Sequence, residues 1–371
     1  MDREVEAGAP IATSRYGGAE RIDELLREWR ALCDEGPCSD PFFRPEWIRA
    51  HLRAFEPDAK LRIVEVRSGG RLRLLLPLVQ ERARLRGFPV RKLRAPAGVH
   101  SCRFDLIHGG EDPTPWIEAA WDHLKDQDGW DVIELRDVPE GGAAERLLAS
   151  AAKDRNYVGR WESMRTPYVP LGAGGLDEVL ARTDTHFRAN LRRRMRKLEQ
   201  KGKVSLRRID RADPQALAAF YALERDGWKG SQGSAIDCDP NTRGFYDEIA
   251  AWAAEEGTLS LYALDLDGEP VAMHFGLAAG GRYFIPKPAF AAAHKECSPG
   301  QLLLQEVLRD CAARGNYELD FLGPWMAWKG DWTQKVRSHG WCYVFRRGPL
   351  GAALHSAKFG LGKLREAIRG R

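Results

Sequence analysis

Residues 259–322 carry the pattern that most constrains the fold of this chain. Three runs of alternating apolar and polar residues are separated by Asp267-Gly268 and Gly280-Gly281, dipeptides that favour tight hairpin turns. Ser298-Pro299-Gly300 then precedes a helical pattern over 301–314, and a short strand pattern follows it. The segment therefore predicts an antiparallel meander followed by a helical crossover, which is typical of mixed α+β folds.

The rest of the chain predicts a second lobe, because 371 residues exceed one ordinary domain. Helical spacing over 19–33 and 42–55 is followed by hairpin strands over 61–81, and the glycine-rich stretch 171–175 suggests a boundary. Residues 176–201 read as one long basic helix. We expect a loose tail over 1–20, an N-terminal lobe over 21–170, a C-terminal lobe over 171–350, and a basic C-terminal helix over 351–371.

Several kinds of chemistry lose support because their motifs are absent from the sequence. There is no P-loop, no G-x-S-x-G and no H-E-x-x-H motif, and the seven cysteines form no C-x-x-C pair. We therefore predict neither a bound metal nor a dinucleotide or serine-hydrolase site. No apolar run approaches the ~20 residues that cross a bilayer, and the acidic N-terminus does not resemble a secretion signal, so we expect a cytoplasmic protein without a transmembrane segment.

Charge is concentrated in one segment. Residues 188–208 hold ten basic residues and one acidic residue, whereas the whole chain has a net charge of only +4. This segment is therefore the place to look for an anionic partner. It could be a solvated face with acidic neighbours, a platform for an anionic substrate, or a surface for tRNA. Aromatic residues are missing from it, which disfavours recognition of single-stranded RNA.

The turn at Ser298-Pro299-Gly300 is a candidate phosphate site. Proline is preorganised for the first position of a helix, and glycine allows another backbone or a ligand to approach closely. The free N–H groups of a first helical turn attract phosphate. A helix simply capped by Ser298 is the alternative.

Three blocks of the second half occur in a defined order. The first is Phe187-Arg188-Ala189-Asn190-Leu191-Arg192-Arg193. The second joins Lys287-Pro288-Ala289-Phe290 to Ser298-Pro299-Gly300-Gln301-Leu302-Leu303. The third is Asp320-Phe321-Leu322-Gly323 with Lys329 and Trp332. Together they resemble the GNAT-superfamily acyltransferases of the CelD/BcsL type, which are related to the Fem-type transferases, and the likeness covers about 40–350. The family has an acid after the aromatic residue of the second block, but here Ala291 follows Phe290.

The resemblance implies an α+β protein of two GNAT-like lobes, each a mixed, mostly antiparallel sheet flanked by helices. It also implies an acyl-CoA co-substrate in the C-terminal lobe and a small-molecule or polymer amine as acceptor. A simple alkyl ammonium, with a pKa of about 10.4, costs roughly 4–5 kcal/mol to deprotonate at pH 7. A base must therefore be present. Backbone N–H groups of the strand at 283–287 could stabilise the oxyanion.

The candidate residues follow from these blocks and from their neighbours. The catalytic candidates are Asp320, Glu224 and Lys329. The candidates for contact with acyl-CoA are Lys287, Ser298, Pro299, Gly300, Gln301 and Leu302. The candidates for substrate contact are Arg188, Arg192, Trp228, Lys229 and Trp332. Structural roles remain open for each group: Asp320 could cap a loop or pair with an arginine, Lys287 could be a solvated edge lysine, and the tryptophans could pack the lobes.

We therefore predict an acyl-CoA-dependent N-acyltransferase. One alternative is an aminoacyl-tRNA-dependent aminoacyl transferase of the Fem type, which would bind tRNA through the basic segment 188–208. The second alternative is a catalytically silent binding protein in a polysaccharide pathway, which the departure at Ala291 keeps open.

Overall fold

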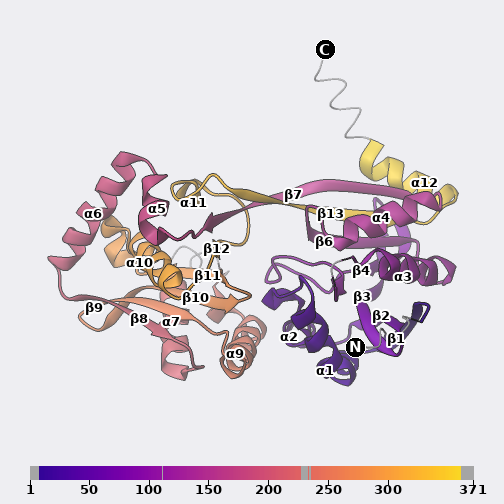
Figure 1. Ribbon diagram of the computed structural model, residues 1–371, viewed down its shortest axis with the longest axis horizontal. Coiled ribbons are helices and arrows are strands. Elements are labelled where there is room, and N and C mark those ends of the chain that lie inside the picture. Colours follow the sequence, from indigo (N-terminus) through magenta and orange to yellow (C-terminus); the bar gives the residue numbers. More distant parts are fainter. Residues whose placement is uncertain (1–7, 111, 227–232, 234, 361–371) are drawn as a thin grey trace, which may run out of the picture. The chain divides into compact units, whose positions relative to one another are not determined.

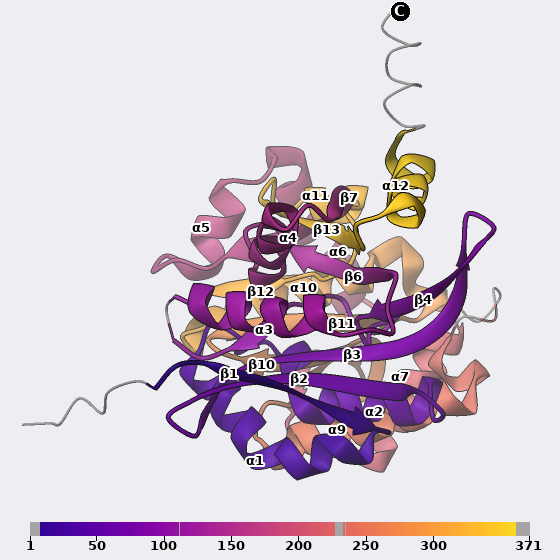
Figure 2. The same cartoon turned by 90° about the vertical axis from the view of Figure 1, so that its right-hand side faces the viewer.

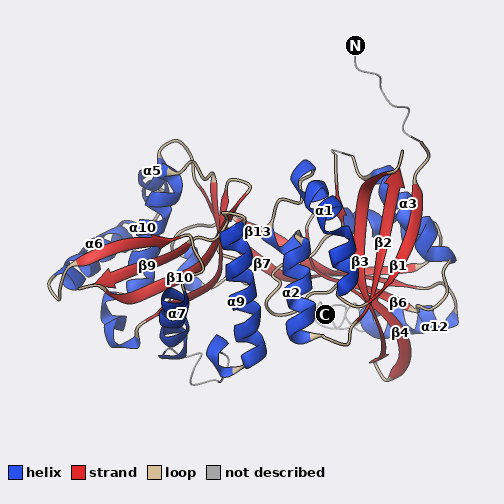
Figure 3. Cartoon of the chain, turned by 90° about the horizontal axis from the view of Figure 1, so that it is seen from below, coloured by secondary structure: helices blue, strands red, loops and turns tan. Residues whose placement is uncertain are grey.

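The computed structural model describes residues 8–110, 112–226, 233 and 235–360. The chain divides into two compact units, residues 1–164 with 338–371, and residues 165–337 (Figure 1). It passes between them within strands β7 (Tyr157–Pro170) and β13 (Val336–Phe345). Both units mix strands and helices (Figure 3), so the predicted α+β class is confirmed.

The sheet of the first unit has the strand order β1-β2-β3-β4-β6-β13, with β5 beside β3. The pairs are antiparallel except for β4 with β6, which is parallel. Their bounds are β1 (Ile11–Gly17), β2 (Lys60–Ser68), β3 (Arg71–Leu85), β4 (Phe88–Arg94), β5 (Ile107–His108) and β6 (Val132–Pro139).

Helices cover both faces of this first sheet (Figure 2). Helices α1 (Glu20–Glu35) and α2 (Pro45–Phe55) bury Ile22, Leu25 and Trp29 against one face, at the helical spacing read from the sequence. Helices α3 (Thr114–Asp126) and α4 (Ala143–Lys153) cover the other face. After β13 come α12 (Pro349–His355) and a π-helical turn over Ser356–Gly360. The remainder of the predicted C-terminal helix lies outside the described residues.

Two expectations about organisation need correction. Residues 11–17 are not part of a loose tail, because β1 pairs antiparallel with β2 over its whole length. The predicted boundaries at 171 and 350 also differ from the unit limits at 164 and 338. The reason is that the second half of β13 returns to the first unit, where it pairs with β6.

The sheet of the second unit has the order β7-β12-β11-β10-β9-β8. Its pairs are antiparallel except for β11 with β12, which is parallel. The predicted meander is present as β9 (Leu261–Leu266), β10 (Glu269–Ala279) and β11 (Arg282–Phe290), flanked by β8 (Val204–Ile209) and β12 (Glu318–Asp320).

The helices of the second unit lie on both sides of its sheet. Phe220 of α7 (Pro214–Asp226) and Tyr246 of α9 (Pro240–Glu255) contact Phe275 of β10. The opposite face carries the core of α10 (Pro299–Ala313), α5 (Gly175–Ala181) and α6 (Thr185–Glu199). Short 3₁₀ turns span Pro41–Phe43, Ile236–Cys238 and Ala292–Cys297, and α11 (Ala327–Gly330) follows β12. None of the described helices combines the length and apolarity needed to cross a membrane.

The predicted single helix over 176–201 is wrong in one respect, because it is two helices. Asp184 adopts an extended conformation and its carboxylate accepts the N–H groups of His186 and Phe187. An aspartate in this position is a strong N-cap, so it starts a new helix there.

Candidate functional site

The parallel strands β11 and β12 separate next to the start of α10. They pair over three positions, from Arg282 opposite Glu318 to Phe284 opposite Asp320. Strand β12 ends there, whereas β11 continues to Phe290. Beyond Phe284, β11 therefore continues without pairing to β12. Two parallel strands that diverge in this way can admit an extended ligand between them.

The N-terminus of α10 follows this strand after one 3₁₀ turn. Ser298 has the left-handed angles φ 48° and ψ 57°, and Pro299 is the first helical residue. The N–H groups of Gln301 and Leu302 both return to the Ser298 carbonyl, at 2.9 and 3.3 Å. Since Pro299 has no N–H, the amide of Gly300 is what the first turn offers to a ligand. The predicted phosphate site at this turn thus reduces to one amide and the helix dipole.

Two predicted donor contacts have side chains that face the protein instead. Leu302 is fully buried in the core of the second unit. The Gln301 side chain donates to the Trp328 carbonyl at 3.3 Å and accepts the Trp332 indole N–H at 2.5 Å. These side chains hold the loop after β12 against α10, so the predicted contact of Gln301 and Leu302 with acyl-CoA is corrected, for their side chains, to a packing role.

Trp332 needs the same correction as a substrate contact. Its side chain is 3% exposed, and its ring meets that of Phe187 edge-on at a centroid distance of 5.1 Å. Burial in this aromatic contact explains the tryptophan without a ligand.

Asp320 lies at the end of β12 and is fully buried. One carboxylate oxygen accepts the Leu322 N–H at 2.9 Å, and the other lies 3.2 Å from Arg337 Nη1. Arg337 also binds Glu318, with Nη1 2.9 Å from Oε1, and its Cζ lies 3.8 Å from the centroid of the Tyr168 ring. The Arg337 guanidinium therefore bridges these two buried carboxylates.

Lys329 is 5% exposed and reaches back to the turn that follows β12. Its Nζ donates to the carbonyls of Leu322 at 2.6 Å and Pro324 at 3.0 Å. Leu322 and Gly323 both have positive φ, at 52° and 60°. An ammonium that holds two carbonyls fixes this turn, so the structure gives Lys329 a positioning role.

Glu224 and Lys287 come together from different elements. Glu224 of α7 is 2% exposed, and its Oε2 accepts the Ile236 N–H at 2.8 Å. Lys287 of β11 places its Nζ 3.9 Å from Glu224 Oε1 and 5.7 Å from the centroid of the Tyr246 ring. Trp228 and Lys229, also predicted here, lie outside the described residues.

The expected oxyanion donors of β11 are fewer than the sequence range suggested. Pro286 and Pro288 have no N–H. His274 of β10 pairs with Pro288, and burial lowers the pKa of His274 to about 3, which keeps its ring neutral. A buried neutral imidazole is a poor proton acceptor near pH 7.

The arginines of α6 fall into two groups: Arg188 binds main-chain carbonyls, and the others make no ion pair with the described residues. The Arg188 guanidinium donates to the carbonyls of Leu180 at 2.7 Å and Thr183 at 2.9 Å, so it closes the end of α5 rather than facing a substrate. Further along the helix is a cationic cluster that makes no ion pair with the part of the chain that the structure describes, namely Arg192, Arg193, Arg194, Arg196 and Lys197. All of these except Arg194 are exposed.

Sequence reasoning missed Arg337 and Tyr246. Both act through their neighbours, and neither belongs to a recognisable motif. The segment Val336-Arg337-Ser338-His339 shows no regular alternation of polar and apolar residues, so its pattern does not indicate Arg337.

Residues 185–330 match the model of an acetyltransferase domain of the GNAT type. The match runs from α6 to α11 and lies inside the second unit. No curated protein matches the chain in sequence. The crystal structure of FemX shares 12% identity, with 90% of this chain and 98% of FemX covered and a TM-score of 0.57. L-PGS from Bacillus licheniformis shares 12%, with 90% and 96% covered and a TM-score of 0.53.

At these identities the two structures show a shared fold. The domain match adds to this, because residues 185–330 are similar to acetyltransferases of the GNAT type. The prediction that the chain is an N-acyltransferase is therefore confirmed for the class of reaction. An N-acyltransferase requires an amine as acceptor, and the described residues contain no cluster of metal-ligating side chains.

Proposed function

We propose that the chain is an acyl-CoA-dependent N-acyltransferase of the CelD/BcsL type. The observation that carries the proposal is the divergence of β11 from β12, which ends at Asp320, together with the start of α10 at Pro299. The Gly300 amide and the dipole of α10 suit the pyrophosphate of a CoA thioester. The acyl carbon would then lie along β11 beyond Phe284.

The reaction joins the acceptor nitrogen to the thioester carbonyl carbon. As the C–N bond forms, the C–S bond breaks and the CoA sulfur leaves as a thiolate that takes up a proton. The amine loses one proton to a base. We assign this role to Glu224, because its contact with Lys287 is as long as 3.9 Å, whereas Asp320 lies 3.2 Å from Arg337 and also accepts the Leu322 N–H. Lys287 is assigned to the donor phosphates or to the acceptor.

Calorimetric titration tests the donor directly. The full chain is titrated with acetyl-CoA, a long-chain acyl-CoA and free CoA. Saturable binding is expected, and Gly300→Asp should weaken it at least tenfold, because a carboxylate at this turn repels the pyrophosphate. A Cβ at Gly300 would lie 3.6 Å from Phe290, an ordinary contact, so the variant should fold. Gly244→Asp, at an exposed glycine with open space around it, is the matched control. Absence of saturable heat with all three compounds contradicts the proposal.

A second donor, aminoacyl-tRNA, is favoured by the unpaired cationic cluster of α6. Arginine guanidiniums without carboxylate partners are available to phosphates. Bulk tRNA is therefore titrated beside CoA at two salt concentrations. Salt-sensitive tRNA binding together with no CoA binding identifies this alternative. Binding of a partner that is indifferent to Lys287→Ala and Asp320→Asn, with no turnover of any donor, identifies a silent binding protein.

A further inference from the structure

Among the described residues of the first unit, one buried arginine has no counter-ion. Arg62 lies on β2 opposite Tyr16 of β1 and is 1% exposed. Side chains alternate along a strand, so Arg62 shares a face with Val64, which packs under α3. The guanidinium is permanently charged. Arg62 is thus a cation within the layer between the sheet and α3.

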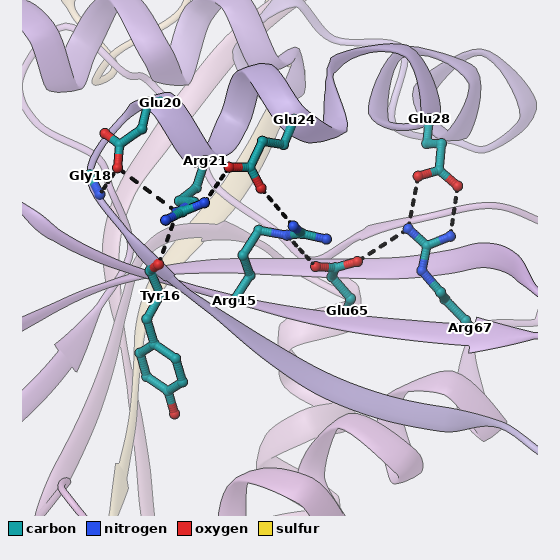
Figure 4. Close-up of polar contacts among 9 residues, drawn as sticks. All are labelled: Arg15, Tyr16, Gly18, Glu20, Arg21, Glu24, Glu28, Glu65 and Arg67. Atoms are coloured by element: carbon teal, nitrogen blue, oxygen red, sulfur yellow. Dashed lines mark hydrogen bonds and ion pairs between the residues drawn. The ribbon is translucent and has the colours of Figure 1, made fainter.

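On the opposite face of the same two strands, arginines form ion pairs with carboxylates (Figure 4). There Arg15 Nε lies 2.7 Å from Glu65 Oε1, and Arg67 Nη1 lies 2.6 Å from Glu28 Oε1. Arg21 contacts Glu24 on the same face. Each of these arginines is more exposed than Arg62, yet each has a carboxylate.

Arg62 has no such partner within the described ranges. Its one hydrogen bond is from Nε to Ser14 Oγ at 3.2 Å, and Nη2 is buried with no acceptor. Its Cζ lies 5.5 Å from the centroid of the Tyr16 ring, which is half exposed and covers the guanidinium. A buried charge with unpaired N–H groups is strongly unfavourable unless something compensates it. Such an atom in a folded protein commonly marks a water or an ion.

A histidine of α3 reaches the same serine: His123 Nε2 lies 2.8 Å from Ser14 Oγ. Burial and the charge of Arg62 lower the pKa of His123, while Asp126 on the same helix opposes that shift. When His123 is protonated, Nε2–H donates to Ser14 Oγ, and the serine hydroxyl proton becomes available to an outside acceptor. Arg62, Ser14 and His123 can then together stabilise one bound anion.

We propose that Arg62, Ser14 and His123 form a binding site for a small oxyanion, a phosphate group or a carboxylate, beneath Tyr16. The guanidinium supplies the charge and the unpaired Nη2 donors, and the serine hydroxyl supplies a further donor. The site lies on β1, β2 and α3 and does not depend on the acyltransfer chemistry of the second unit. Both ligand chemistries offer the oxygen pair that a guanidinium fork recognises.

Nuclear magnetic resonance of ¹³C-labelled histidines tests the site in the full chain. The His123 signal is assigned with His123→Gln and titrated with pH in chloride, acetate or inorganic phosphate at one ionic strength. Bound anion should raise the pKa of His123 by about one unit or more, since an opposite charge within about 4–6 Å shifts a pKa by that amount. An unchanged titration in both acetate and phosphate overturns the proposal. A response to phosphate alone identifies a phosphoryl ligand, and a response to both identifies a general oxyanion site.

Variants locate the effect. Phosphate or acetate should raise the midpoint temperature of unfolding of the wild-type chain saturably, and Arg62→Met should lose this shift. Arg67→Met, on the same strand but paired with carboxylates, should keep it. If Arg62→Met does not fold, Ser14→Ala replaces it, because Ser14 lies on an edge strand and is only half-buried. An equal shift in wild type and variant shows binding elsewhere and contradicts the proposal.

Discussion

Replacing Lys329 by methionine separates a positioning role from a catalytic one. Methionine preserves most of the apolar stem, so the change removes chiefly the ammonium. The wild-type Nζ makes two hydrogen bonds, at 2.6 and 3.0 Å, to the carbonyls of Leu322 and Pro324. Hydrogen bonds from a charged group contribute about 1.5–3 kcal/mol each. Solvation of the freed carbonyls offsets part of the loss, so the expected decrease in unfolding free energy is about 2–4 kcal/mol.

The assay is chemical denaturation followed by tryptophan fluorescence. Lys153→Met is the matched control, because its side chain is 73% exposed and 3.5 Å from Glu118, and its removal should change stability by less than about 0.5 kcal/mol. Lys329→Arg should recover part of the loss. A stability unchanged in Lys329→Met, with turnover abolished, would refute the positioning account and restore Lys329 as a catalytic group.

Two other predictions concern charge. Burial lowers the pKa of His274 to about 3, below its usual value of 6.5, so the unfolded chain binds more protons between these values. The contribution of His274 to the free energy of unfolding is therefore favourable above pH 6.5 and is lost as pH falls, by about 2 kcal/mol between pH 7 and pH 5. His274→Leu should flatten the measured pH dependence of stability by that amount. A profile as steep as that of the wild-type chain contradicts the assignment. On α6, Arg192, Arg193 and Arg196 are changed together to glutamine. If all three contact phosphates, the slope of log affinity for duplex nucleic acid against log salt concentration should fall by about 2.7. An unchanged slope in a titration with tRNA excludes this surface as the tRNA contact.

The sequence predicted the second unit well because local signals there agree with the tertiary structure. Tight-turn dipeptides at Asp267-Gly268 and Gly280-Gly281 lie between the observed strands, and Pro299 begins α10 as expected. The helix 176–201 was predicted as one element because its apolar spacing continues through Asp184. The competing N-cap of that aspartate ended the run.

The site was harder to predict than the fold. Asp320 and Glu224 are buried, which the sequence does not show, and their partners Arg337 and Lys287 are distant in sequence. Lys329 binds main-chain carbonyls of its own loop, and Gln301 of α10 binds a carbonyl and an indole N–H of that loop. No pattern of residue types distinguishes such use from contact with a ligand. The sequence predicts a tail over residues 11–17 because a single edge strand has few apolar residues to reveal it.

Acyl transfer itself tests the central claim most directly. Thiol release from acetyl-CoA is followed in the presence of lysine, ethanolamine or putrescine, and the acylated amine is identified by mass spectrometry. We predict release that depends on enzyme and amine, is lost in Gly300→Asp through weaker donor binding, and falls in Glu224→Gln at saturating donor. A protein that binds CoA compounds but never releases thiol, or whose Glu224→Gln variant turns over at the wild-type rate, would contradict the account.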